Sequence, residues 1–213
     1  MKIVAVWTGL SEESTTTKLA ERMINSAVTQ LEEKHETAKV VRINLRELAM
    51  ALSSMTVSMA PSAELERAFD DVRSADAIIT ATPIYKATPV GLHTLFWQLI
   101  DDEPLAGTPT LIGATGGTPR HSLATDSTLR PLLAYLKALV LPTSVFAATD
   151  DWGDAHAGAA LNSRIDDAVA QLVALATGNP DQEQKKSQRS QDPLDPATIT
   201  PFDELLAAHT HHG

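Results

Sequence analysis

The chain contains no cysteine among its 213 residues. Disulfide bonds, thiolate metal ligands and cysteine nucleophiles are therefore excluded. Basic residues are also scarce, because 17 lysines and arginines stand against 27 aspartates and glutamates, and the formal net charge is -10. Nucleic acid and anionic membrane surfaces repel such a chain, so we expect neither as a partner.

Long apolar runs are missing as well. The apolar start at residues 1–6 meets Gly9 and Ser11 after too few residues for a signal-peptide core or a membrane span. We expect it to form the first strand instead. Hydrophobic residues still make up 43% of the chain, which is enough for the core of one domain. The expectation is a soluble cytoplasmic protein without a metal site.

Strand and helix patterns alternate along residues 2–177. Short apolar, β-branched runs predict strands, and apolar residues at helical spacing predict helices. The strands are expected at 2–7, 39–43, 77–81, 110–114 and 144–147, and the helices at 19–31, 63–74, 89–101, 123–139 and 161–176. Residues 44–62 are expected to be irregular apart from a helical turn at 45–51, and Pro131 is expected to break or kink its helix.

This alternation predicts an α/β fold with a doubly wound, five-stranded parallel sheet, although it does not reveal the strand order. The domain is expected to span residues 1–177. From residue 178 the composition changes to glutamine, lysine, serine, aspartate and proline, so we expect 178–213 to be a mostly disordered tail. One short amphipathic helix is expected within it at 202–208.

Residues 76–102 carry the clearest local signal. The strand at 77–81 should stop at Thr82 and Pro83, because proline has no N–H for a ladder. Thr88 then offers an N-cap oxygen and Pro89 suits the first helical position. The loop between lies at the carboxyl end of a strand, where α/β sheets bind ligands.

Loops after the first, third and fourth expected strands should open on the same edge of a parallel sheet. The first, residues 8–17, has several hydroxyl side chains directly before a helix, which suits a phosphate cradle or an ordinary helix cap. It lacks the Walker and dinucleotide glycine patterns.

The other two loops offer mostly backbone groups. A Pro-x-Tyr turn can present peptide groups to the edge of a planar ring while Tyr85 packs on its face, although an ordinary turn also fits. Gly116 and Gly117 allow a backbone to approach a ligand closely, although a flexible turn also fits. Together the three loops describe a site for a mononucleotide with a flat ring. The candidate binding residues are Thr8, Ser11, Ser14, Thr15, Thr16, Thr82, Pro83, Ile84, Tyr85, Lys86, Thr115, Gly116 and Gly117.

The segments 82–87 with Gly91, 114–118, 121–126, 129–133 and 136–138 carry a family resemblance. The chain resembles the NAD(P)H-dependent FMN reductases of flavodoxin-like fold over residues 1–177. It is most similar to the reductase components of two-component flavin monooxygenases, such as the alkanesulfonate systems. The resemblance implies strand order 2-1-3-4-5, a homodimer or homotetramer, FMN phosphate on the first loop and the isoalloxazine against the other two.

Two positions depart from the family pattern. Ser11 stands where relatives carry an arginine, and Glu12 and Glu13 follow it, which should weaken the hold on a phosphate dianion. Ser127 stands where sulfonate-system relatives carry a tyrosine, in a helical insertion tied to oligomer contacts and flavin release.

The resemblance implies that NADPH or NADH passes hydride to flavin N5 without a catalytic side chain, and that reduced FMN goes to a luciferase-like or alkanesulfonate-type monooxygenase. Ser14, Thr15 and Thr16 would hold the phosphate. Lys86 or Arg120 would meet phosphates of the nicotinamide nucleotide. Three alternatives stay open: a quinone or azo reductase with tightly bound FMN, an electron-carrier flavodoxin, and a protein whose tail helix docks a monooxygenase.

Overall fold

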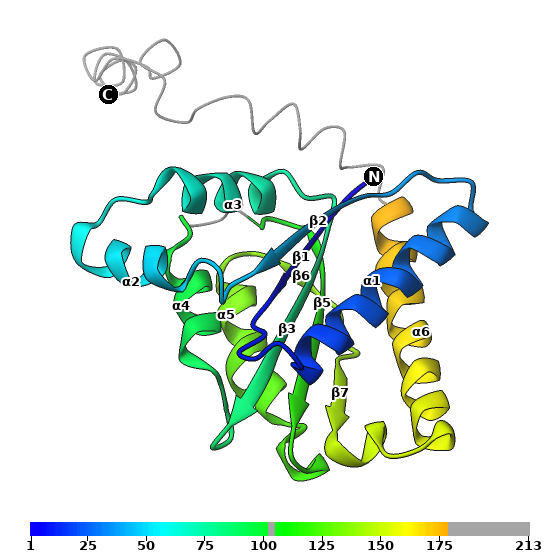
Figure 1. Ribbon diagram of the computed structural model, residues 1–213. Helices are drawn as coiled ribbons and strands as arrows, with labels where there is room; N and C mark the ends of the chain where they lie inside the picture. Colours follow the sequence, from blue (N-terminus) through cyan, green and yellow to red (C-terminus); the bar gives the residue numbers. More distant parts are fainter. Residues whose placement is uncertain (102–104, 179–213) are drawn as a thin grey trace, which may run out of the picture. The chain divides into compact units, whose positions relative to one another are not determined.

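The computed structural model describes residues 1–101 and 105–178, in which strands and helices alternate (Figure 1). The strands are β1 (Lys2–Trp7), β2 (Lys39–Asn44), β3 (Ala77–Tyr85), β4 (Thr88–Pro89), β5 (Pro109–Gly116), β6 (Leu139–Val140) and β7 (Val145–Ala148). The helices are α1 (Thr15–Glu33), α2 (Ala49–Ser58), α3 (Ala63–Arg73), α4 (Gly91–Leu99), α5 (Arg130–Tyr135) and α6 (Ala155–Thr177). Two 3-10 turns, η1 (Pro119–His121) and η3 (Thr149–Trp152), and one π-helical turn, η2 (Thr125–Leu129), complete the list. The predicted tail from residue 179 and its helix at 202–208 lie outside the described residues.

The sheet has the order β2-β1-β3-β5-β6. Strands β6 and β7 both pair with β5, β6 near its start and β7 near its end. All of these pairings are parallel, so the implied order 2-1-3-4-5 is confirmed, with the fifth strand divided in two. The division falls at Pro142. Leu141 still donates its N–H to Thr110, but proline has no N–H with which to continue the ladder.

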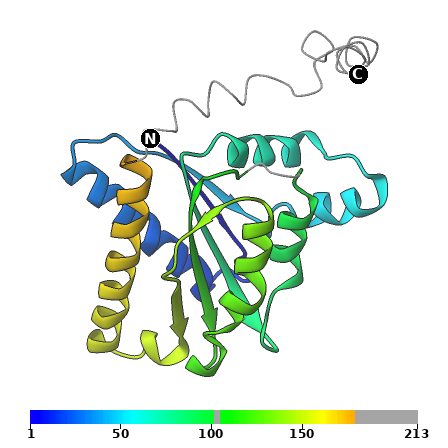
Figure 2. The same ribbon diagram turned by 180° about the vertical axis from the view of Figure 1, so that it is seen from behind.

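Helices cover both faces of the sheet. Alternate residues of β1 point to opposite sides: Ile3 and Ala5 pack with residues of α1 and α6, whereas Val4 and Val6 pack with residues of α2 to α5. Figures 1 and 2 show the same two layers from front and back. Because both faces are buried, the central strands read as nearly continuous apolar runs, which is why the sequence revealed them.

The strand before the second loop is longer than predicted. The stop expected at Thr82 and Pro83 is wrong, because β3 continues to Tyr85. Pro83 pairs with Thr115 of β5, whereas β1 pairs with β3 only as far as Ala81. On the side that β1 has left, Val90 donates its N–H to the Pro83 carbonyl at 3.2 Å, and the missing proline N–H is tolerated at this edge of the strand.

The helix start expected at Thr88 and Pro89 is wrong for a related reason. These residues form β4, antiparallel to the end of β3, and the Thr88 hydroxyl donates to the carbonyl of Tyr85 at 3.1 Å. Lys86 and Ala87 make the turn with φ of 50° and 64°, the left-handed conformation that two-residue hairpin turns require. Helix α4 consequently begins after the hairpin.

Two helical predictions also need correction. Residues 44–62 are not irregular, because α2 packs through the buried Leu52. Its Met50 and Val57 are 82% and 86% exposed, so apolar residues occupy both faces and hide the helical period. The helix expected over 123–139 is a π-helical turn followed by α5, with Pro131 in the first turn of α5, where no N–H is needed.

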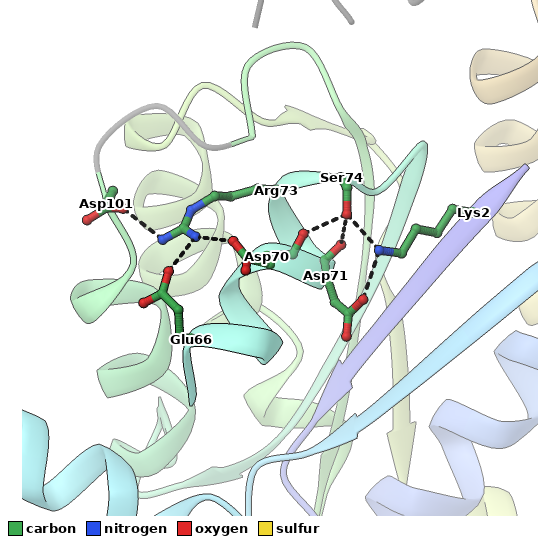
Figure 3. A network of polar contacts seen from close by, with 7 residues as sticks. All are labelled: Lys2, Glu66, Asp70, Asp71, Arg73, Ser74 and Asp101. Atoms are coloured by element: carbon green, nitrogen blue, oxygen red, sulfur yellow. Dashed lines mark hydrogen bonds and ion pairs between the residues drawn. The ribbon is translucent and has the colours of Figure 1, made fainter. Parts of the chain in front are cut away.

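A network of charges lies at the amino-terminal edge of the sheet (Figure 3). The Arg73 guanidinium donates to Glu66 at 3.0 Å, to Asp70 at 2.6 Å and to Asp101 at 2.8 Å. Lys2 Nζ donates to Asp71 at 2.9 Å. These contacts tie α3 to β1 and to the end of α4, on the edge opposite to the carboxyl ends of the strands.

In residues 1–101 and 105–178, no helix has the length and apolar character needed to cross a membrane.

Candidate functional site

A cavity of about 370 Å³ opens at the carboxyl edge of the sheet. It is bounded by the loop between β1 and α1, the ends of β3 and β5, the end of β7 and the turn η3. Small-molecule sites of doubly wound folds occupy this edge and have volumes of this order. The expectation that three loops open on one edge is therefore confirmed, and a fourth segment joins them.

Most of the predicted binding residues line this cavity. They are Ser11, Ser14, Thr15, Thr16, Pro83, Ile84, Tyr85, Thr115, Gly116 and Gly117. Thr8, Thr82 and Lys86 do not line it: Thr8 and Thr82 are buried, and Lys86 is exposed in the hairpin turn. That these residues bind FMN stays a prediction.

The amino-terminal end of α1 forms one wall. Ser14 is its N-cap, and its hydroxyl accepts a hydrogen bond from the Thr17 N–H at 3.3 Å. The N–H groups of Thr15 and Thr16 have no acceptor within the helix, as in any first turn. The Ser14 hydroxyl accepts this bond and keeps its own proton for a ligand. Peptide donors, a free hydroxyl proton and the helix dipole make this wall attractive to an anion.

A buried pair of hydroxyls joins this wall to the sheet. Thr16 Oγ1 and Thr115 Oγ1 lie 2.7 Å apart, so one donates to the other. The accepting hydroxyl keeps its own proton, which can serve a ligand. This bond fixes the first turn of α1 against the end of β5, so the anion-binding wall and the glycine loop keep a defined separation.

Gly9 allows the first loop to leave β1. A Cβ on this residue would lie 2.2 Å from Thr17 Oγ1 and 3.3 Å from Ser14 Oγ. The Thr17 hydroxyl also accepts a hydrogen bond from Trp7 Nε1 at 3.1 Å, and the Gly9 N–H donates to Asn44 Oδ1 at 3.1 Å. The loop is therefore held by contacts to the ends of β1 and β2, and residue 9 has to be a glycine to fit without displacing Thr17.

His93 lies fully buried behind the same loop. Trp97 Nε1 donates to its Nε2 at 3.2 Å, and because an indole N–H can only donate, the proton of the neutral ring is on Nδ1. Nδ1 then donates to the Thr8 hydroxyl at 3.0 Å, while the Thr80 hydroxyl lies 2.9 Å from Nε2. Burial lowers the pKa of His93 from 6.5 to about 3. The ring therefore stays neutral and anchors Thr8, which begins the loop.

The ends of β3 and β5 form the opposite wall. Ile84 is 4% exposed and Tyr85 is 56% exposed, so the tyrosine stands at the rim. A Cβ on Gly116 would lie 2.7 Å from Phe146 Cζ, whereas one on Gly117 would meet nothing within 4 Å. Gly116 is thus needed for packing, and Gly117 presents bare backbone to open space, where a flat ligand can approach.

Several lining residues were missed by the sequence reasoning: Leu10, Glu13, Ala147, Thr149 and Trp152. Three of them lie at the end of β7 and in η3. Strand order 2-1-3-4-5 places the end of the fifth strand beside the fourth, and that order was the signal that could have included them. Trp152 is held in place by Arg22, whose guanidinium carbon lies 4.7 Å from the centre of its ring.

The described residues that line the cavity include no lysine or arginine. Arg120, proposed to meet a nucleotide phosphate, is exposed in η1 and does not line it. No cluster of three or more metal-binding side chains occurs within residues 1–101 and 105–178. The lining offers hydroxyls, peptide groups and aromatic edges, which bind and orient a ligand rather than exchange protons with it.

Comparison with known proteins agrees with this chemistry. Residues 1–153 match the family described as NADPH-dependent FMN reductase. The chain is 38% identical to an FMN reductase (NADPH) of Pseudomonas aeruginosa over 110 residues, which is 52% of this chain and 59% of the relative. It is 35% identical to the NADH-dependent FMN reductase SfnE of Pseudomonas putida over 177 residues, which is 82% of this chain and 92% of the relative.

A solved structure shares the fold. An oxidoreductase from Corynebacterium diphtheriae superimposes with a TM-score of 0.79 at 37% sequence identity, covering 84% of this chain and 98% of that one. The flavodoxin-like fold and the oxidoreductase class predicted from the sequence are thereby confirmed. The chain belongs to the NADPH-dependent FMN reductase family.

Proposed function

We propose that this protein oxidises NAD(P)H, reduces FMN in the cavity at the carboxyl edge of the sheet, and supplies the reduced flavin to a separate monooxygenase. One observation supports this most strongly: an anion-binding helix end and an open glycine backbone line the same cavity. The first matches a phosphate monoester and the second matches a flat ring, and these are the two ends of FMN.

The protein's contribution is to bind and orient. Ser14, Thr15 and Thr16 hold the phosphate through hydroxyls and peptide N–H groups at the start of α1. Peptide groups of Ile84–Tyr85 and Gly116–Gly117 line the cavity and would hold the flavin ring, where their N–H groups would favour negative charge. When bound, FMN supplies the hydride-accepting chemistry. No side chain of the cavity has to act as an acid or base.

Delivery to a partner is the finer part of the proposal. Ser11 lines the cavity at the position where the FMN reductases that the chain resembles carry an arginine, and Glu13 adds a negative charge to the lining. The phosphate therefore lacks a cationic partner, and a loosely held, exchangeable flavin is expected. Such a flavin suits a reductase that hands its product to a second enzyme. The luciferase-like or alkanesulfonate-type partner, the homo-oligomer and the cytoplasmic location stay predictions.

Steady-state oxidation of NADPH and NADH, measured while added FMN is varied, tests this function. We expect a rate that rises and saturates with free FMN. A full rate from yellow protein without added FMN, dependent on a quinone or azo acceptor, would instead favour a reductase with tightly bound flavin. Flavin binding without oxidation of either nucleotide would leave an electron carrier.

A double substitution tests the phosphate assignment. Ser14→Ala with Thr16→Ala removes two hydroxyls from the wall and should raise the Kd for FMN about a hundredfold or more, because two hydrogen bonds to a charged group contribute about 3 kcal/mol or more together. Ser62→Ala is the matched control, because Ser62 caps α3 in the same way, accepting from the Leu65 N–H at 3.2 Å. It should reduce stability without changing FMN affinity. Equal FMN affinity in the double variant and the wild type would refute the assignment.

A further inference from the structure

Glu13 occupies an unusual place for a carboxylate. It directly precedes the N-cap of α1 and lines the cavity beside the proposed phosphate wall. Its carboxylate accepts a hydrogen bond from Lys18 Nζ at 2.9 Å. The side chains of Glu13 and Lys18 are 88% and 52% exposed, so the pair spans the outer surface of the first helical turn and is free to rearrange.

The negative charge of Glu13 repels the phosphate that we propose binds at the amino-terminal end of α1. The hydrogen bond from Lys18, with its positive charge, lowers the pKa of the Glu13 carboxyl, so Glu13 is ionised at neutral pH. A carboxylate beside a helix amino terminus is attracted by the same dipole that attracts a phosphate. The other described residues of the lining carry no lysine or arginine to offset it.

Lys18 offsets part of that charge. Its ammonium group lies one turn along α1 and donates to the Glu13 carboxylate, while the peptide N–H groups of Thr15 and Thr16 have no acceptor within the helix. With Lys18 present, the charge of Glu13 is partly neutralised. Without it, the full negative charge of Glu13 would compete for the helix end.

We propose that Glu13 weakens FMN binding, and so favours FMN exchange, by competing with the FMN phosphate for the amino terminus of α1. Lys18 moderates this competition. The inference rests on the proposed function, because it assigns a specificity role within the same site. The ligand group recognised is a phosphate monoester, and the Glu13 carboxylate competes with it for the same helix end.

Binding of FMN and of riboflavin, measured by flavin fluorescence at low salt, tests the proposal. Riboflavin has the same ring without the phosphate, so it reports effects unrelated to charge on the phosphate. Glu13→Gln should tighten FMN on the order of fivefold, the size of a screened charge pair near a surface. Lys18→Gln should weaken FMN by a similar factor. Riboflavin affinity should stay unchanged in both variants.

Glu12→Gln is the matched control. Glu12 is the adjacent exposed carboxylate, carries the same charge and does not line the cavity. If Glu12→Gln tightens FMN as much as Glu13→Gln does, the effect is one of net charge and the proposal is wrong. An unchanged FMN affinity in Glu13→Gln would also overturn it. Failure of the wild type to bind FMN at all would overturn the proposed function itself, which separates the two claims.

Discussion

Gly9 and Gly117 are both glycines of the cavity loops, yet they serve different purposes. A side chain on Gly9 would collide with the Thr17 hydroxyl at 2.2 Å, whereas a side chain on Gly117 meets open space. Gly9 is therefore fixed by the packing of the first loop, and Gly117 by the room that it leaves for a ligand.

These two sites give a paired prediction. Gly9→Ala should displace Thr17, break the hydrogen bond from Trp7 and lower the unfolding free energy by about 1–3 kcal/mol, the range for overpacking. Gly117→Ala should leave stability within about 0.5 kcal/mol of the wild type, as for exposed substitutions, while weakening FMN binding. Urea unfolding and an FMN titration separate the two effects. Equal destabilisation by both substitutions would contradict the packing argument.

His93 gives a pH dependence with a definite sign. Its pKa is about 3 in the folded protein and 6.5 is its ordinary value, so the unfolded chain binds more protons between these limits. Unfolding free energy should therefore fall as the pH drops from about 6.5 towards 3, by up to about 1.4 kcal/mol per pH unit from this residue. Its partners Thr8, Thr80 and Trp97 do not titrate in this range.

Urea unfolding at several pH values, compared between the wild type and His93→Gln, measures this contribution. The variant should be less stable at pH 7, because it loses part of the buried hydrogen-bond network. Its stability should fall less steeply with acid, because the buried imidazole is gone. Identical acid dependence in the two proteins would show that His93 is not buried as a neutral ring.

The β3–β4 hairpin carries backbone strain that sequence reasoning did not anticipate. Lys86 and Ala87 both adopt positive φ, although neither is glycine, asparagine or aspartate. A non-glycine residue in this conformation costs about 1–2 kcal/mol. The hairpin accepts the strain because it carries β3 past the end of β1, and so places Ile84 and Tyr85 at the cavity.

Relief of this strain is measurable. Ala87→Gly should raise the unfolding free energy by about 0.5–1 kcal/mol, since the strain it removes exceeds the added entropy of the unfolded chain. Ala160→Gly, at an exposed position within α6, should lower it by about 0.5–1 kcal/mol. Thermal unfolding of the two variants checks the opposite signs. A loss of stability in Ala87→Gly would show that the turn is not strained.

The elements that were predictable share one property. Central strands are buried on both faces, so apolar runs at 77–81 and 110–114 marked β3 and β5 directly. The two-residue strands β4 and β6 are too short to show any period. Strand β6 also depends on a pairing partner distant in sequence, in β5, whereas β4 folds back on the adjacent end of β3. Helix α2 was missed because Met50 and Val57 place apolar side chains on its exposed face.

The candidate site was predictable to the extent that it follows from parallel strands. Loops after consecutive strands of such a sheet share its carboxyl edge, so Ser14–Thr16 and Gly116–Gly117 were expected to meet. Trp152 was not expected, because its place depends on the fifth strand and on Arg22 of α1. Thr8 and Thr82 were included on position alone, whereas both are buried: the Thr8 hydroxyl contacts His93 and the Thr82 hydroxyl donates to the Pro83 carbonyl.

In the described residues, one charge network and the cavity lie at opposite edges of the sheet, although the cavity edge also has the ion pairs Glu13–Lys18 and Arg164–Asp151. The Arg73 and Lys2 network occupies the amino-terminal edge, and the cavity occupies the carboxyl edge. Helix α6 lies beyond residue 153, where the family match ends. It nevertheless completes the face shared with α1, through hydrogen bonds such as Ser26 to Asp166 at 2.6 Å, and so supports the helix that carries the phosphate wall.

A crystal structure of the protein grown with FMN tests the central claim most directly. The account predicts phosphate density beside Ser14, Thr15 and Thr16, and ring density between Tyr85 and Gly116–Gly117. Flavin bound at any other place, or an empty cavity at a saturating FMN concentration, would contradict it.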